Sequence, residues 1–206
     1  MILWGGTNNS KAINTVGIYT PYTDYSLSGN LFGLMGTEVV LQNNAGDDLI
    51  LNANGPFTFN GTINGGSSYN VTVLTQPTNP SQTCTITNAS GTNVSSNITD
   101  VTVTCVDDTF LIGGMVTGLL PGNPNTLILQ NNNSDDLLIH QDGAFVFATP
   151  LLDLQAYSIS ILSQPNSPAQ MCSIVAGSGN VAGDDVDTIE IICPMGTELI
   201  FSQGFE

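Results

Sequence analysis

Four cysteines are the residues of this chain whose chemistry is most clearly indicated by their spacing. Cys84 and Cys105 are 21 residues apart, and Cys172 and Cys193 repeat that separation 88 residues later. Neither pair has a CxxC partner, and the single histidine, His140, is far from both in sequence, so the ligand set of a tetrahedral zinc site is missing. The spacing therefore predicts two disulfides, Cys84–Cys105 and Cys172–Cys193, which persist only outside a reducing cytosol.

Two pairs of acidic residues offer a second chemistry, cation binding. Asp47 with Asp48, and Asp135 with Asp136, each follow a short Asn-rich stretch that predicts a hairpin turn. Calcium accepts carboxylates and amide carbonyls as ligands, although the DxDxDG order of a calcium loop is absent. Asn, Gly and Asp also supply turn conformations and cap backbone donors, which is the interpretation we favour. Calcium at these acids is the alternative, and no other metal or cofactor is expected.

His140 is the only side chain that titrates near neutral pH, and it could serve as a general base. Its counterpart in the first half of the chain is Asn52, which predicts a solvent-facing strand position for both. The sequence lacks GxSxG, a Ser/His/Asp set at suitable spacing and a phosphate-binding glycine loop. No catalytic residue is therefore predicted, and the chain is not expected to be an enzyme.

The charge balance excludes whole classes of partner. The chain of 206 residues has one basic residue, 17 acidic residues and a formal net charge of −16. Binding of phosphates requires Lys and Arg, so neither nucleic acid nor an anionic membrane surface is an expected partner. No apolar run reaches the about 18 residues that a membrane span needs. The opening MILWGG lacks the basic and long apolar regions of a signal peptide.

The chain repeats itself at the same offset of 88 residues as the cysteines. LQNNAGDDLIL from Leu41 returns as LQNNNSDDLLI from Leu129, and GPFTF from Gly55 returns as GAFVF from Gly143. Self-similarity at such a period indicates two structural modules in tandem.

The repeat predicts the domain boundaries. Module 1 is expected over residues 25–106 and module 2 over residues 110–193, with an N-terminal extension of residues 1–24 and a C-terminal tail of residues 194–206. Only residues 107–109 separate the modules. A linker this short should hold them in a stiff, extended row.

Alternating apolar residues predict an all-β fold. In module 1 the alternating stretches cover residues 25–34, 38–42, 48–52, 56–60, 68–75, 83–87 and 100–106. No helical period competes. Phe57 and Phe59, like Val101 and Val103, fall on one face at period two, as expected of a sandwich core filled from two sheets.

Seven short strands with regular turns resemble an immunoglobulin-like or fibronectin-like sandwich. Module 1 also carries the pattern YSLSGNLFGL…TEVVLQNNAGDDLILNANGPFTF…YNVTVLTQP…QTCTIT…VTVTC, and module 2 repeats its scheme. Over residues 25–193 this pattern is similar to tandem β-sandwich repeats of secreted and surface proteins of Gram-negative bacteria. The resemblance implies two tandem immunoglobulin-like β-sandwich modules in an exported, non-catalytic structural or adhesive protein, with no defined ligand.

Both ends of the chain fall outside the repeat, yet both contain strand-like stretches, AINTVGIYT from Ala12 and TELIFSQGF from Thr197. An extended terminal segment can pair with the free edge of an open sandwich, in its own chain or in a neighbouring copy. The N-terminal segment is the favoured donor strand and the C-terminal segment the second. The donor residues predicted on this basis are Ala12, Ile13, Val16, Ile18, Tyr19, Leu199 and Phe201.

Two functions follow from these features. The first is a structural subunit of an extracellular fibre or matrix at the cell surface, in which copies of the chain join head to tail. Heterologous contacts that do not close make fibres, so the expected partner is a second copy. The alternative is a monomeric adhesin or carbohydrate-binding module whose loops hold a glycan or a surface protein, with or without calcium.

Overall fold

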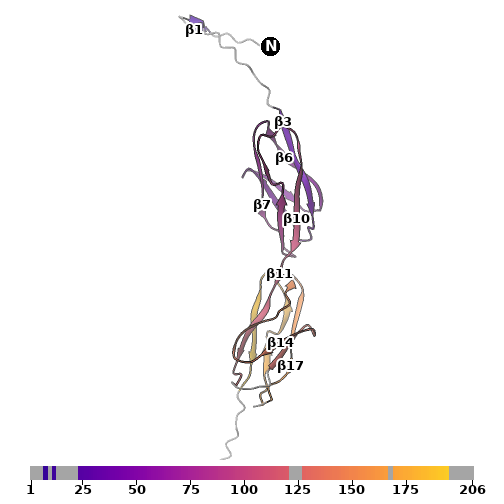
Figure 1. Cartoon of the computed structure of the whole chain (residues 1–206), viewed down its shortest axis with the longest axis vertical. Helices are drawn as coiled ribbons and strands as arrows, with labels where there is room; N and C mark the ends of the chain where they lie inside the picture. The colour runs from indigo at the N-terminus through magenta and orange to yellow at the C-terminus, as the bar shows by residue number, and fades with distance from the viewer. Residues whose placement is uncertain (1–6, 9–10, 13–22, 121–126, 167–168, 195–206) are drawn as a thin grey trace, which may run out of the picture.

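A computed structural model describes residues 7–8, 11–12, 23–120, 127–166 and 169–194 of the chain. In these residues all the regular elements are β-strands, and two modules follow one another along an elongated molecule (Figure 1). Each module holds two four-stranded sheets and one disulfide. The predicted all-β fold with one disulfide in each module is therefore confirmed.

The strands of module 1 agree closely with the predicted stretches. They are β3 (Asp24–Phe32), β4 (Val39–Asn43), β5 (Asp47–Leu51), β6 (Gly55–Asn64), β7 (Tyr69–Thr75), β8 (Gln82–Thr87), β9 (Ser90–Gly91) and β10 (Ile98–Asp107). One sheet has the order β6-β3-β10-β8 and the other the order β5-β4-β7-β9. The first and last long strands, β3 and β10, lie side by side in parallel, with Leu27 opposite Ile98.

Module 2 repeats this topology. Its strands are β11 (Thr109–Phe110), β12 (Ile112–Thr117), β13 (Leu127–Asn131), β14 (Asp135–Ile139), β15 (Gly143–Val146), β16 (Leu151–Leu152), β17 (Ala156–Ser163), β18 (Ser173–Val175), β19 (Ser178–Asn180) and β20 (Val186–Ile192). The sheet orders are β15-β12-β20-β18 and β14-β13-β17-β19. A short β11–β16 pair continues the β12–β15 ladder toward module 1. Only Asp108 separates β10 from β11, so the linker is shorter than the three residues predicted.

The core of each module lies between its two sheets. In module 1 the inward side chains of β3 and β6, among them Leu31 and Phe57, pack with Leu41 of β4 and Val71 of β7, and all are buried. Module 2 has its own core cluster. Because alternate residues of each strand face inward, both sheets contribute apolar side chains worth about 1.5–3 kcal/mol each when fully buried.

The acidic hairpins form the turns that their sequence predicts. Asn44 and Ala45 have φ angles of 49° and 57°, and Asn132 and Asn133 have φ angles of 48° and 58°. Two successive left-handed residues form the tight turn that matches the twist of paired strands, and asparagine tolerates this conformation well. The turns place the acidic pairs at the start of β5 and β14.

Within the residues that the structure describes, there is no helix with the length and apolar character of a membrane span.

Candidate functional site

The acidic pairs of both hairpins are engaged in hydrogen bonds within their modules. Asp47 accepts a hydrogen bond from the backbone N–H of Gly61 on β6, with 3.0 Å between N and Oδ2. Asp48 accepts one from the side-chain amide of Gln42 on β4, with 2.6 Å between Nε2 and Oδ1. The first contact ties the β5 edge to the opposite sheet, and the second closes the β4–β5 hairpin.

Module 2 reproduces both contacts. Asp135 accepts from the backbone N–H of Thr149 at 2.9 Å, and Asp136 accepts from Nε2 of Gln130 at 2.6 Å. Within the described residues no three side chains of His, Cys, Asp or Glu gather closely enough to hold a metal ion. The carboxylates thus act inside the fold, and calcium at these positions remains a prediction.

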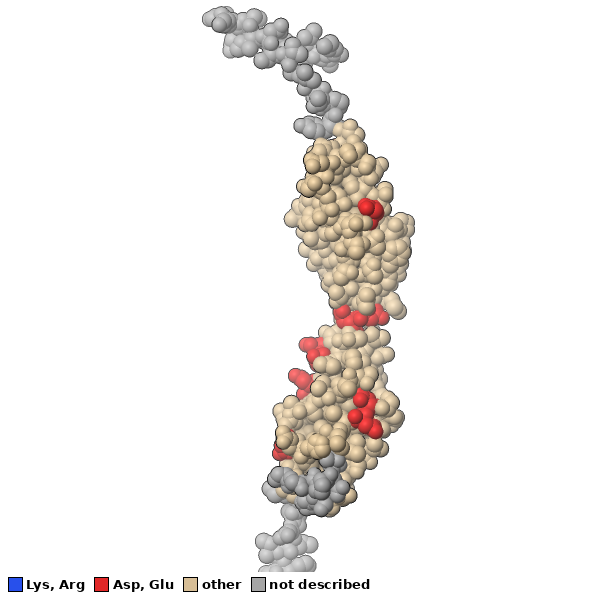
Figure 2. All heavy atoms as spheres, viewed as in Figure 1, with Lys and Arg blue, Asp and Glu red and all other residues tan. Residues whose placement is uncertain are grey.

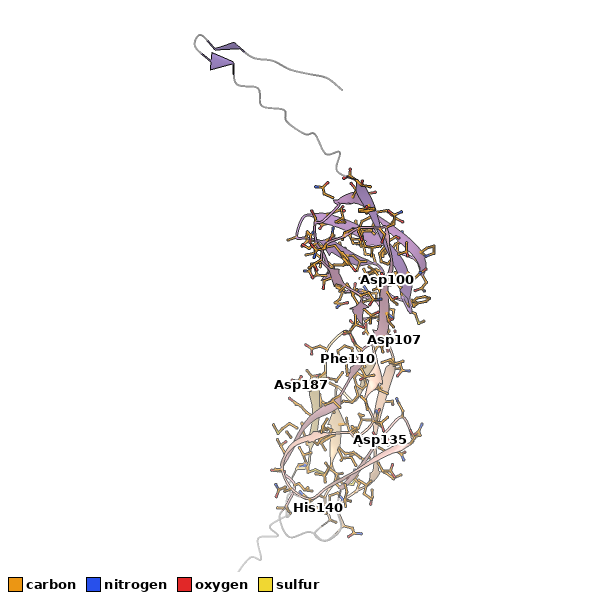
Figure 3. All side chains as sticks on the ribbon, turned by 45° about the horizontal axis from the view of Figure 1, so that its top comes forward. Asp100, Asp107, Phe110, Asp135, His140 and Asp187 are labelled. Carbon is orange, nitrogen blue, oxygen red and sulfur yellow. A yellow bond between two sulfur atoms is a disulfide. The ribbon has the colours of Figure 1, made fainter. Side chains whose placement is uncertain are left out.

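His140 is exposed, as predicted, but it is not within a strand. It is the first residue after β14, which ends at Ile139. It lies at the end of module 2 opposite to Asp107 (Figure 3). The open hollow of about 470 Å³ beside it is lined by Leu138–Ala144, a segment without Ser, Cys or Lys. Asp142 in that segment accepts hydrogen bonds from the backbone N–H groups of Gly118 and Leu119, at 2.9 and 2.7 Å. The absence of enzymatic activity remains a prediction.

The predicted donor residues are largely beyond the described structure. Ala12 lies in β2 (Lys11–Ala12), which pairs with β1 (Thr7–Asn8) through Thr7. The others, Ile13, Val16, Ile18, Tyr19, Leu199 and Phe201, lie outside the described residues.

Each module presents one edge strand whose second half is apolar, β5 (DDLIL) in module 1 and β14 (DDLLI) in module 2. Within the described residues each pairs with a neighbour on one side only. Both ladders run in continuous register, β5 against β4 and β14 against β13. The side chains of Ile50 and Leu138 occupy the same place in the two modules and are 61% and 49% exposed. A free edge beside exposed apolar side chains is a site where another strand can pair.

The apolar surface continues from each edge strand across its sheet. Ile50 is the direct cross-strand partner of Val40, and Leu74 is exposed at the irregularity between β4 and β7. In module 2 the corresponding residues are Leu138, Ile128 and Leu162. Val40 and Ile128 are half-buried, whereas Ile50, Leu74, Leu138 and Leu162 are exposed. Scattered exposed apolar residues need no explanation, but the same two exposed positions beside the same half-buried one in both modules indicate a repeated surface feature.

The contact between the two modules is a further feature of the structure, and it was not predicted from the sequence. The backbone N–H of Ser81 in module 1 donates a hydrogen bond to Oδ2 of Asp153 in module 2, with 2.7 Å between the atoms. The backbone carbonyl of Ser81 accepts a hydrogen bond from the N–H of Asp108 in the linker, at 3.0 Å. Acidic atoms are visible at the narrow waist where the modules meet (Figure 2).

No family model and no curated protein matches the chain. Among solved structures, the Bacillus anthracis TIE protein is similar over 81% of this chain and 34% of its own length, with 11% sequence identity and a TM-score of 0.44. The major pilin protein (T-13) from Streptococcus pyogenes is similar over 87% of this chain and 98% of its own, with 11% identity and a TM-score of 0.21.

A leucine-rich repeat protein from Bacteroides thetaiotaomicron is similar over 83% of this chain and 26% of its own length, with 12% identity and a TM-score of 0.21. The chain thus spans 34% of the TIE protein and 26% of this last protein. These TM-scores are too low to carry an argument about function, and the resemblance to tandem repeats of Gram-negative bacteria is not confirmed by a family match.

Proposed function

We propose that this chain is a non-enzymatic, extracellular structural subunit of a surface fibre or matrix, and that copies join when an extended terminal segment of one adds as a strand to a free sheet edge of the next. The observation that carries the proposal is the pair of edge strands β5 and β14, each with an exposed apolar side chain at the same position. Strand addition supplies affinity through main-chain hydrogen bonds and specificity through alternate side chains.

The other sheet edges of module 1 are poorer acceptors. β6 contains Pro56, which cannot donate to a ladder, and its register with β3 is interrupted between Ser26 and Ser28. β9 is two residues long. β8 presents the polar residues Thr83, Thr85 and Thr87 on its exposed face. Natural edges are protected by such features. β5 has charged residues only at its start, Asp47 and Asp48, and its remaining residues are apolar, in continuous register with β4.

The open part of the acceptor strand follows from the acidic contacts. The hydrogen bond between Asp47 and Gly61 holds the start of β5 against β6. The remainder of β5, from Asp48 to Leu51, is therefore the portion where an added strand would pair. An apolar residue of that strand would extend the surface formed by Ile50 and Val40.

The donor is a terminal segment of a second copy, with residues 12–22 first and residues 197–205 second. Both segments contain the β-branched and aromatic residues that favour strands, among them Val16, Ile18 and Phe201. The extracellular location is supported by the two disulfides, because disulfides persist in oxidising compartments.

The proposal is tested by the assembly state of the purified chain, measured by light scattering after size-exclusion chromatography and by negative-stain microscopy. The wild-type chain is expected to form linear oligomers, and both removal of residues 1–24 and the double variant Ile50→Lys/Leu138→Lys should shorten them. The matched control, Thr85→Lys/Ser173→Lys, adds the same charge on the β8 and β18 edges and should assemble normally. Monodisperse wild-type monomers would end the proposal.

A further inference from the structure

Asp153 is the one buried polar side chain of the described residues that has no counterpart in the other module. Asn43 and Asn131 form one repeat pair of buried polar residues, and Gln82 and Gln170 form another. Asp153 is also buried, with 7% of its surface exposed, but module 1 has Gly65 at the same place in the repeat. A buried carboxylate is costly unless it is fully hydrogen-bonded, so its presence in one module alone requires an explanation outside the module fold.

The hydrogen bonds of Asp153 supply that explanation, because they join both modules to one carboxylate. From within module 2, the N–H groups of Gly183 and Leu154 donate to Oδ1 at 2.8 and 2.9 Å. From module 1, the N–H of Ser81 donates to Oδ2 at 2.7 Å. A charged acceptor roughly doubles the strength of such bonds relative to a neutral one.

Ser81 is the matching element on the module 1 side. Its N–H is bound by Asp153 and its carbonyl by the N–H of Asp108, which is the single residue between β10 and β11. Ser81 is the last residue of the loop Pro77–Ser81. The loop is closed by the hydrogen bond from the N–H of Gln82 to the carbonyl of Pro77. One short loop of module 1 is therefore fixed to the linker and to module 2 at the same residue.

The charge of Asp153 is balanced chiefly by backbone amides, with a smaller contribution from the side chain of Ser81. The pKa of this carboxyl lies below its ordinary value because the N–H of Ser81, aided by those of Gly183 and Leu154, stabilises the charged form more than burial disfavours it. An open hollow of about 330 Å³ beside the joint, lined in part by Thr78 and Ala182, gives solvent protons access to the site.

The other titratable groups near the joint are all carboxylates, and each is held by a different partner. Asp107 accepts from the side chain of Gln82 and Asp108 from the hydroxyl of Thr83, both at 2.7 Å. On the turn after Gly183, Asp185 accepts from the N–H of Leu111 at 2.7 Å, and Asp184 accepts from the N–H of Asp185 at 2.8 Å. The loops Thr78–Ser81 and Leu151–Gln155 contribute no titratable side chain besides Asp153.

We infer that the charged carboxylate of Asp153 fixes the relative orientation of the two modules, so that the chain behaves as one stiff rod. Protonation of this carboxylate breaks the contact and lets the modules reorient about Asp108. A group whose folded pKa is lowered contributes stability that is present above its ordinary pKa, near about 4, and that is lost as the pH falls through the folded value. The rod is therefore stiff at neutral pH and hinged in strong acid, while each sandwich keeps its disulfide.

The experiment measures the relative orientation of the modules in the full chain by residual dipolar couplings, together with amide hydrogen exchange at Ser81. At neutral pH the wild-type chain should fit one alignment tensor for both modules, and the Ser81 amide should be protected. Asp153→Asn, which keeps the shape and removes the charge, and Asp153→Ala should each require two tensors. Protection of Ser81 should fall about tenfold or more in both variants relative to that of Val103 in the core of module 1.

The control variant Asp136→Asn removes an exposed carboxylate of module 2 and should leave the single tensor intact. Acidification of the wild-type chain should reproduce the Asp153→Asn result, and acidification of Asp153→Asn should change the module orientation no further. Independent tensors for the wild-type chain at neutral pH would overturn the inference, as would a single tensor in a folded Asp153→Ala variant. Stiffness that depends on added calcium would also overturn it, because the joint would then be held by the surrounding carboxylates.

Discussion

Cys84 and Cys105 face each other directly across the β8–β10 ladder, with their Cα atoms 3.9 Å apart. The disulfide therefore joins neighbouring strands of one sheet and does not link the two sheets. Cys172 and Cys193 repeat this arrangement in module 2 with a Cα separation of 4.0 Å. Each bond closes a loop of 21 residues in sequence and restricts the unfolded chain more than the folded one.

The double variant Cys84→Ser/Cys105→Ser should lower the free energy of unfolding of module 1 by about 3 kcal/mol, because a loop of this size regains its entropy in the unfolded state. The corresponding Cys172→Ser/Cys193→Ser variant should do the same in module 2. Denaturant unfolding, followed with a probe in each module, measures both values. Mass spectrometry that finds four free thiols in the native protein, or a bond between the modules, would contradict the prediction.

The buried amide of Gln82 should contribute strongly to the stability of module 1. Its Oε1 accepts from the N–H groups of Met35 and Gly36, and its Nε2 donates to the carbonyl of Gly33 and to Asp107. The variant Gln82→Ala removes a buried side chain and leaves several partly buried groups without partners, so it should cost about 2 kcal/mol or more in the free energy of unfolding.

The repeat offers controls for this variant. Gln170 makes the equivalent contacts with Gly118 and Leu120, so Gln170→Ala should destabilise module 2 in the same way. The variant Gln42→Ala removes a side chain whose amide bonds to the exposed Asp48, and it should change stability by less than about 0.5 kcal/mol. Equal losses in the free energy of unfolding for Gln82→Ala and Gln42→Ala would show that burial of the Gln82 amide does not add to the stability of module 1.

Gly29 permits the close parallel pairing of β3 with β10. A Cβ atom at this position would collide with the backbone carbonyl of Val101 and would lie 2.8 Å from the Phe57 ring. The variant Gly29→Ala should therefore destabilise module 1 by about 1–3 kcal/mol, the usual cost of overpacking. Gly114, where a Cβ would meet Ile189, should behave alike. Thermal unfolding measures both, and Gly46→Ala, at an open turn position, should be near neutral.

Much of this fold is predictable because its signals are local. The period-two pattern places Phe57, Phe59 and Val103 on the inner face, and the Asn-rich turns fix where β5 and β14 begin. The cysteine spacing suffices for the pairing, since each module contains only two cysteines.

The parallel β3–β10 pair and the module joint were not predicted, because both depend on contacts between residues far apart in sequence. Ser81 and Asp153 are 72 residues apart, and no local pattern marks either. A signal was nevertheless present in the repeat: an acid stands at Asp153 where the first copy has Gly65, and such a break indicates a role outside the repeated fold. The repeat also has a glutamine two residues before a cysteine in each module, Gln82 and Gln170, and this repeated polar position could have predicted a structural role for both side chains.

Tyr69 should make module 1 sensitive to alkali. Burial, with a smaller contribution from the charge of Asp100, raises the pKa of its phenol above the ordinary value, and its hydroxyl donates to the carbonyl of Asn88 at 3.2 Å. A raised folded pKa contributes stability that is complete below the ordinary value near about 10 and is lost as the pH rises through the folded value.

The variant Tyr69→Phe should cost about 1 kcal/mol at neutral pH, because the carbonyl of Asn88 loses its donor. Above about pH 10 the wild-type chain should lose stability more steeply than the variant, so the difference between them should shrink or reverse. Denaturant midpoints measured across the alkaline range, with phenolate absorbance recorded in the same samples, give both quantities. Parallel pH profiles for the two proteins would show that Tyr69 does not titrate against the fold.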